Sequence, residues 1–126
     1  MYRVDVTHIK DYEFAVRSGA HELIIDAKAG AGLTPPDALL ASLGSCIGVY
    51  IQKYLDGAKL APGAFKITVE AEFAKDPLSF KLIKIEAKLG GIQLDDKRKT
   101  AFLEFIKNCP VHNTLKGSPR VEVKLS

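Results

Sequence analysis

Two cysteines are the residues of this chain whose chemistry is hardest to explain as packing alone. Cys46 follows Gly44 and Ser45 within an apolar stretch, and Cys109 directly precedes Pro110. Two such thiols can act in succession, because the thiolate of one attacks a peroxide oxygen and becomes a sulfenic acid, with which the other condenses to a disulfide. The simpler alternative is that both are inert buried thiols, and the number of cysteines does not decide between the two.

An attacking thiol in apolar surroundings needs a nearby cation, because such surroundings raise the pKa of a thiol. Arg17, His21 and His112 are the candidates for activating Cys46, and the sequence does not choose among them. Cys109 has a different setting, since the amides at the start of a following helix would favour its thiolate. The many Leu, Ile, Tyr and Phe residues nearby suit an apolar peroxide as substrate.

A metal site is the competing interpretation of the same residues. Cys109 and His112 have C-x-x-H spacing, and Cys46 with His21 would complete four zinc ligands. Neither half is a paired CxxC motif, so we expect no metal and no cofactor. Each histidine, His8 included, is expected to be a surface or hydrogen-bonded residue.

Length and composition indicate one ordinary globular domain spanning residues 1–126. Hydrophobic residues make up 47% of the chain and charged residues 26%, which excludes disorder by composition. The net charge of +3 is spread thinly, so no nucleic-acid partner is expected. No apolar leader is visible at the start, and the apolar tract Ala38–Ile51 is shorter than the roughly 18–20 residues that span a bilayer. We therefore predict a cytoplasmic protein that does not enter a membrane.

The segment from Thr34 to Gly57 predicts one long helix that is apolar on nearly every face. Such a helix requires burial on all sides. Its small residues Ala41, Ser45 and Gly48 would let a second helix approach closely, so we expect an obligate dimer packed through this helix. The alternative is that both sheets of a single chain wrap around it.

Asp37 has two interpretations. It lies three residues after Thr34, where a carboxylate can complete a capping box at the start of the helix. It could also orient a cation beside a thiolate. Asp37 precedes Cys46 by nine residues, about 13–14 Å along a helix, so within one chain it cannot touch that sulfur. A catalytic Asp37 would have to serve a cysteine of the partner subunit.

Alternating patterns and turn residues place the remaining elements around this helix. Asp95 is a candidate cap for a second helix, and the Pro62-Gly63 step separates the long helix from the strands that follow it. The predicted order is β-β-β-α-β-β-α-β, an α+β fold. The strands are expected at residues 2–7, 12–17, 22–27, 65–73, 82–89 and 120–125, with a short helical turn at 111–116.

Two runs of residues are similar to the motifs of a known family. The run from Thr34 to Cys46, TPPDALLASLGSC, resembles the P-x-E-L-L-x-A-x-G-x-C signature of the OsmC/Ohr family. The run from Asn108 to Leu115, NCPVHNTL, resembles its second motif, in which a cysteine precedes a proline and a short N-T-L run. The resemblance covers nearly the whole chain. It implies an OsmC-like fold, with antiparallel sheets around a long central helix, in an intertwined homodimer.

The resemblance also implies a function and a role for each site residue. Family members of this kind are antioxidant, stress-response peroxidases that reduce organic hydroperoxides and are regenerated by a dithiol such as a lipoylated protein. By motif, Cys46 is the peroxidatic cysteine and Cys109 the resolving one. Asp37 takes the place of the family's glutamate, and Arg17 is the candidate for its arginine. His21 matches the less-characterised OsmC-like branch, which often has histidine there.

Two other classes of function compete with the peroxidase. One is a dimeric OsmC-like thiol protein that binds an apolar or acyl ligand without significant peroxidase activity. The other is a binding module whose cysteines are inert. Consumption of an organic hydroperoxide with a dithiol separates the first interpretation from both.

Overall fold

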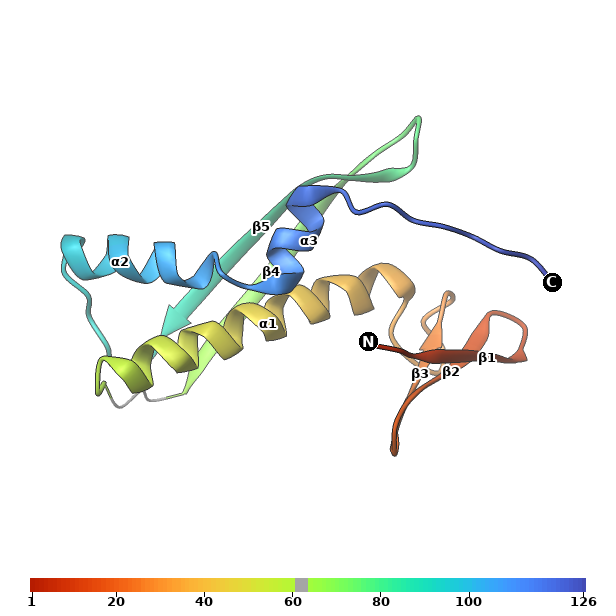
Figure 1. Cartoon of the computed structure of the whole chain (residues 1–126), viewed down its shortest axis with the longest axis horizontal. Helices are drawn as coiled ribbons and strands as arrows, with labels where there is room; N and C mark the ends of the chain where they lie inside the picture. Colours follow the sequence, from red (N-terminus) through yellow and green to blue (C-terminus); the bar gives the residue numbers. More distant parts are fainter. Residues whose placement is uncertain (61–63) are drawn as a thin grey trace. The chain divides into compact units, whose positions relative to one another are not determined.

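The computed structural model describes residues 1–60 and 64–126, so the Pro62-Gly63 step lies outside the described residues. The chain combines antiparallel sheets with three helices, which confirms the predicted α+β class (Figure 1). It forms two compact units, Met1–Ala41 and Ser42–Ser126. In chain order the elements are β1 (Asp5–Lys10), β2 (Glu13–Ser18), β3 (His21–Asp26), α1 (Pro35–Gly57), β4 (Phe65–Ala74), β5 (Ser79–Leu89), α2 (Asp96–Ile106) and α3 (Pro110–Gly117).

The N-terminal unit is built on a three-stranded antiparallel sheet with β2 in the centre. The strand predicted at residues 2–7 lies instead at Asp5–Lys10. After β3, the carboxylate of Asp26 accepts hydrogen bonds from the backbone amides of Lys28, Gly30 and Ala31, at 2.9, 3.1 and 2.9 Å. These bonds lower the pKa of Asp26. They also tie its side chain to the loop that follows β3, at residues 28–31.

Helix α1 begins as the sequence predicts. Thr34 Oγ1 accepts a hydrogen bond from the Asp37 amide at 3.2 Å, the geometry of an N-terminal cap. With 23 residues, α1 is long and apolar enough to cross a membrane by length and composition alone, so the shortness of the tract Ala38–Ile51 does not exclude a span. Length and apolar composition are weak evidence for a membrane span, because the core helices of soluble proteins have both. Leu43, Ile47, Ile51 and Leu55 form a buried row along α1, the pattern of a core helix.

In the second unit, α1 packs on the apolar face of the β4–β5 ribbon. Phe65, Ile67 and Val69 of β4 lie opposite Leu89, Ala87 and Ile85 of β5, and all six face the same side. A Cβ atom added at Gly48 would come within 3.0 Å of the Ile67 side chain, and one at Gly44 within 3.0 Å of Val69. The prediction that Gly48 admits a helix of a second chain is therefore wrong, because this residue admits β4 of its own chain.

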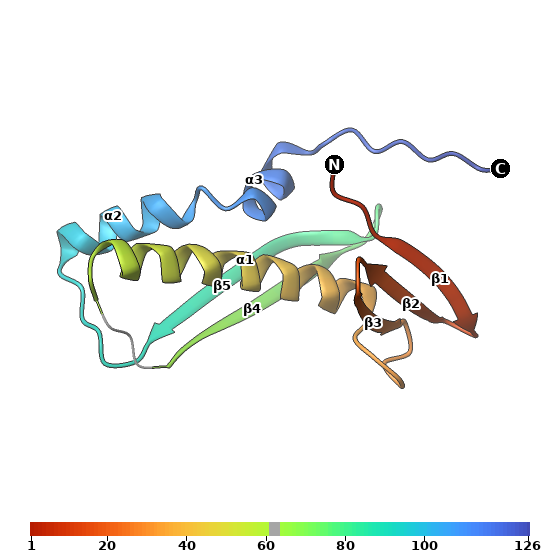
Figure 2. The same ribbon diagram turned by 60° about the horizontal axis from the view of Figure 1, so that its bottom comes forward.

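Helix α2 lies alongside the C-terminal half of α1 (Figure 2). Tyr54 of α1 meets Phe102 of α2 edge to face, with ring centroids 5.0 Å apart. Asp95 caps α2 as predicted, accepting a hydrogen bond from the Arg98 amide at 2.8 Å. The predicted helical turn at 111–116 is confirmed by α3.

The strand predicted at residues 120–125 is not formed. Val121, Val123 and Leu125 alternate as a strand requires, but they are 80%, 92% and 96% exposed. An alternating pattern favours a strand only where a neighbouring strand completes its hydrogen bonds. Within the described part of this chain, the segment has no such neighbour.

Candidate functional site

The two cysteines lie together in the second unit, although they come from separate elements. Cys46 is half-buried on α1, one residue before the buried row position Ile47. Cys109 is fully buried in the short link between α2 and α3, and Cys46 packs against the core cluster that contains it. Both are free thiols. Packing thus brings together the pair that the sequence predicts to react in succession.

The two thiols differ in their electrostatic settings. Burial raises the pKa of Cys109, and a hydrogen bond with the Cys46 thiol raises it further. The backbone amides of Val111 and His112 at the start of α3 oppose this and lower the pKa, though Cys109 makes no side-chain hydrogen bond of ideal cap geometry. The helix amides thus act as the sequence predicts, but burial outweighs them, and Cys109 is protonated at neutral pH.

The other three predicted site residues belong to the N-terminal unit. Arg17 lies opposite Glu22 on the β2–β3 pair, and their side chains form an ion pair at 2.7 Å. The hydrogen bond to Glu22 and its negative charge raise the pKa of Arg17. His21 opens β3 and lies opposite Ser18, and Asp37 occupies the first turn of α1. The action of these three side chains on a thiol stays a prediction.

His112 has a ring environment that the sequence did not predict. The Nδ1 atom of its ring is buried and has no hydrogen-bond partner in the described part of the chain. The expectation of a surface or hydrogen-bonded histidine is therefore wrong for His112, whereas His8 fits it through a 2.9 Å bond between Nε2 and the Asp11 carbonyl oxygen. The C-x-x-H spacing brings the backbone amide of His112 to the Cys109 sulfur, where it lowers the pKa of that thiol.

The same spacing does not assemble a metal site. No three Cys, His, Asp or Glu side chains gather closely enough to hold a metal ion anywhere in residues 1–60 and 64–126.

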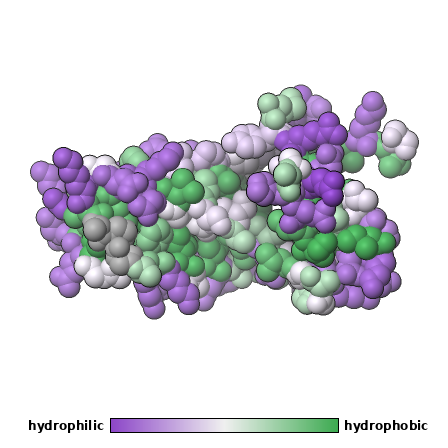
Figure 3. All heavy atoms as spheres, turned by 90° about the horizontal axis from the view of Figure 1, so that it is seen from below, coloured by the Kyte–Doolittle hydropathy of each residue, from purple (hydrophilic) through white to green (hydrophobic). Residues whose placement is uncertain are grey.

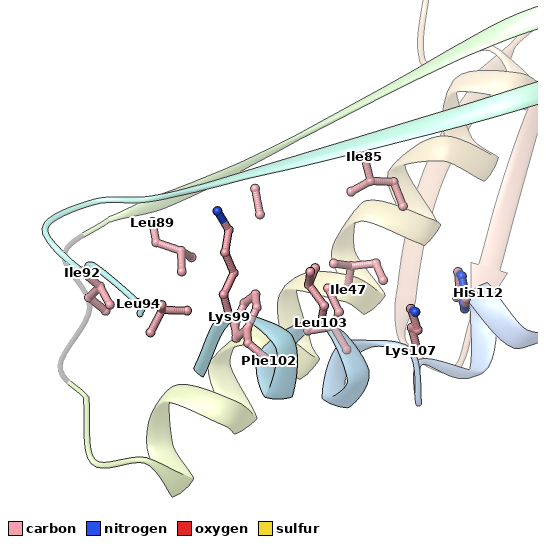
Figure 4. A pocket seen from close by; sticks show the side chains of 12 residues that line it. Ile47, Ile85, Leu89, Ile92, Leu94, Lys99, Phe102, Leu103, Lys107 and His112 are labelled. Atoms are coloured by element: carbon pink, nitrogen blue, oxygen red, sulfur yellow. The ribbon is translucent and has the colours of Figure 1, made fainter. Parts of the chain in front are cut away.

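An open apolar groove of about 460 Å³ lies beside the thiols, between β5 and α2 (Figure 4). Neither cysteine lines it, but Ile47 follows Cys46 in α1, and His112 contributes its ring. A site for a small apolar molecule is typically about 300–1,000 Å³ in volume. The wall of the groove between β5 and α2 is formed by Ile47, Ile85, Ala87, Leu89, Ile92, Leu94, Lys99, Phe102, Leu103, Ile106, Lys107 and His112.

Solved structures with the same fold come from several bacteria. An OsmC-like protein from Mycoplasma pneumoniae superposes with a TM-score of 0.82 at 20% identity, covering 93% of this chain and 88% of the other. A protein from Psychrobacter arcticus has a TM-score of 0.80 at 25% identity, covering 90% and 88%. The organic hydroperoxide resistance protein OsmC of Legionella pneumophila has a TM-score of 0.67 at 18% identity, covering 93% and 91%.

Curated proteins give no match to the chain. The family model for OsmC-like proteins matches residues 27–124, which include both cysteine motifs, α1 and the β4–β5 ribbon. That match covers well over half of the sequence and agrees with the solved structures. The chain belongs to the OsmC-like protein family.

Proposed function

We propose that this protein is a cysteine-based peroxidase that reduces organic hydroperoxides, with Cys46 as the peroxidatic and Cys109 as the resolving residue. The observation that carries the proposal is that the half-buried Cys46 packs against the core cluster that contains the buried Cys109, with both thiols free. Two free thiols in one cluster can form a disulfide once the first has been oxidised to a sulfenic acid. The name of the Legionella pneumophila relative, an organic hydroperoxide resistance protein, supports the same substrate class.

In the first step the Cys46 thiolate attacks one oxygen of the hydroperoxide. The O–O bond breaks, the sulfur is oxidised to a sulfenic acid, and the departing alkoxide takes up a proton and leaves as an alcohol. Cys46 suits this step because it is half-buried and can be reached, whereas Cys109 is fully buried.

In the second step Cys109 attacks the Cys46 sulfur. An S–S bond forms, the S–O bond breaks, and the Cys109 proton joins the departing hydroxide to give water. A protonated Cys109 is the appropriate starting state, because it cannot compete for peroxide, and it carries the proton that the second step needs. An external dithiol, such as a lipoylated protein, then reduces the disulfide and becomes a disulfide itself.

The charged residues of the N-terminal unit are proposed to activate the peroxidatic thiol. A cation from Arg17 or His21 would stabilise the Cys46 thiolate, and the Asp37 carboxylate would orient that cation. The helical rise separates Asp37 from the cysteine of its own chain, so this arrangement places the site between two subunits.

A homodimer is further supported by the apolar surface that a single chain leaves uncovered. Figure 3 shows apolar side chains exposed on one face. In the second unit, Val49 of α1 is 52% exposed and Leu82 of β5 is 42% exposed. Exposed apolar patches of this kind mark association surfaces. We therefore propose that the protein forms an intertwined homodimer. We also propose that it acts in the cytoplasm, without nucleic-acid or membrane partners.

The proposal is tested by a stoichiometric pulse of cumene hydroperoxide on the reduced protein, followed by peptide mass spectrometry without reductant. The expected product is an intramolecular Cys46–Cys109 disulfide, together with one equivalent of cumyl alcohol. Recovery of two unmodified thiols after the pulse would overturn the peroxidase.

A further inference from the structure

The groove between β5 and α2 combines an apolar wall with basic side chains and lacks acidic ones. Nine of its lining residues are Ile, Leu, Ala or Phe, two are lysines and one is His112. No Asp or Glu lines it. A groove of this composition has no carboxylate to balance the charge of a bound cation, but its lysines can balance the charge of a bound anion.

Its two lysines are not equivalent. Lys107 is already paired, with its Nζ 3.4 Å from a carboxylate oxygen of Glu104. Lys99 forms no ion pair with any of the described residues. Figure 4 shows its side chain extending from α2 across the groove toward β5, with Leu89, Ile92 and Leu94 on one side. Lys99 is therefore a free ammonium group held over an apolar surface.

We propose that this groove binds an amphipathic carboxylate, with the carboxylate on Lys99 and its alkyl chain along the wall toward Ile47. The Lys99 ammonium group can donate a charge-assisted hydrogen bond to the carboxylate. The apolar wall can bury the methylene groups of the alkyl chain. The site does not rest on the proposed peroxidase, since neither thiol lines the groove.

Charge decides among the possible occupants. A neutral lipid would leave Lys99 without a partner, and a cationic amphiphile would meet only like charge. A second copy of this chain could cover the groove instead, and in that case the assembled protein would have no room for a small amphiphile. The test therefore uses the protein in its native assembly.

The experiment is titration calorimetry of the reduced protein with dodecanoate, dodecanol or dodecyltrimethylammonium, each below its micelle concentration. We expect saturable binding of dodecanoate at one per chain, weaker binding of dodecanol and none of the cation. Lys99→Gln should weaken dodecanoate binding about tenfold, as expected for the loss of a charge-assisted hydrogen bond. Lys97→Gln, on the same helix but outside the groove, is the matched control and should bind as wild type.

A second variant tests the apolar wall. Ala87→Phe fills the groove from β5 and should abolish binding, whereas Ala101→Phe on the exposed side of α2 should not. Cys46→Ser should bind dodecanoate as wild type, which separates this site from the peroxidase. Absence of saturable binding, equal binding of anion and cation, or equal effects of Lys99→Gln and Lys97→Gln would each overturn the proposal.

Discussion

Cys46 packs against the core cluster that contains Cys109, and Cys109 is fully buried while Cys46 is half-buried. The contact joins the middle of α1 to the link before α3. The two sulfurs have unequal access to solvent, and the pKa of Cys109 is raised, which suits Cys109 to the part of the resolving thiol.

The acidity of Cys109 is the first test. Because burial and the Cys46 thiol raise its pKa, Cys109 should titrate with a midpoint above that of an ordinary cysteine. Cys46→Ala should move the midpoint down but not below the ordinary value, because burial remains. The Cys109 Cβ chemical shift, followed by NMR across a pH series, measures both without a reagent having to reach the buried sulfur. A midpoint below that of a model thiol would show that the α3 amides outweigh burial.

The second prediction concerns the contact of α1 with β4. Gly48→Leu should lower the free energy of unfolding by about 1–3 kcal/mol, because the new side chain meets Ile67 in a packed interior. Gly57→Leu is the control, since an added Cβ there meets nothing within 4 Å. Chemical denaturation measures the difference. If Gly48→Leu dissociated the dimer and left the stability of each chain unchanged, the glycine would serve the subunit interface after all.

The third prediction is a pH dependence of folding in the N-terminal unit. The folded pKa of Asp26 is lowered by three amide hydrogen bonds, so its contribution to stability is complete above the unfolded pKa of about 3.9 and is lost as the pH falls through the folded pKa. Asp26→Asn should be less stable than wild type near neutral pH, and the gap should close in acid.

The control for Asp26 is Asp11→Asn in the same unit, because the Asp11 carboxylate makes no hydrogen bond within the described residues. Denaturation monitored from neutral pH to below the ordinary aspartate pKa compares the three proteins. A stability gap between wild type and Asp26→Asn that widened in acid would contradict the assigned sign.

The fourth prediction separates capping from catalysis at the start of α1. Thr34→Ala removes the oxygen that accepts from the Asp37 amide, and should cost about 0.5–2 kcal/mol of stability with little effect on turnover. Asp37→Ser keeps a short polar side chain but removes the charge, and should lower hydroperoxide turnover with a smaller loss of stability. Steady-state turnover and thermal unfolding of both variants give the comparison. Full turnover by Asp37→Ser would reduce Asp37 to a structural residue.

The sequence predicted those elements whose signals are local. The cap at Thr34, the end of α1 at Gly57 and the cap at Asp95 follow from residue types at fixed spacings, and the structure has all three. The alternating residues at 65–73 and 82–89 likewise predicted two strands, and the structure has β4 and β5 there as an antiparallel pair. Local chemistry determines such features whatever the rest of the chain does.

What the sequence could not predict depends on partners distant in the chain. The strand expected at residues 120–125 has the right pattern but no neighbouring strand among the described residues. Gly48 is small enough for a close helix contact, but it faces Ile67 of β4 instead. At Cys109 the helix amides were foreseen, whereas the burial that outweighs them follows from the packing of α1 and α2 around it.

The order of the two cysteines is the central claim, and single-turnover stoichiometry tests it most directly. One pulse of cumene hydroperoxide is given to Cys46→Ser and to Cys109→Ser without reductant, and the remaining peroxide and trapped sulfenic acid are measured. Cys109→Ser should consume about one equivalent and carry the sulfenic acid on Cys46, because its attacking thiol is intact. Cys46→Ser should consume none. Consumption by Cys46→Ser at the rate of wild type would contradict the account.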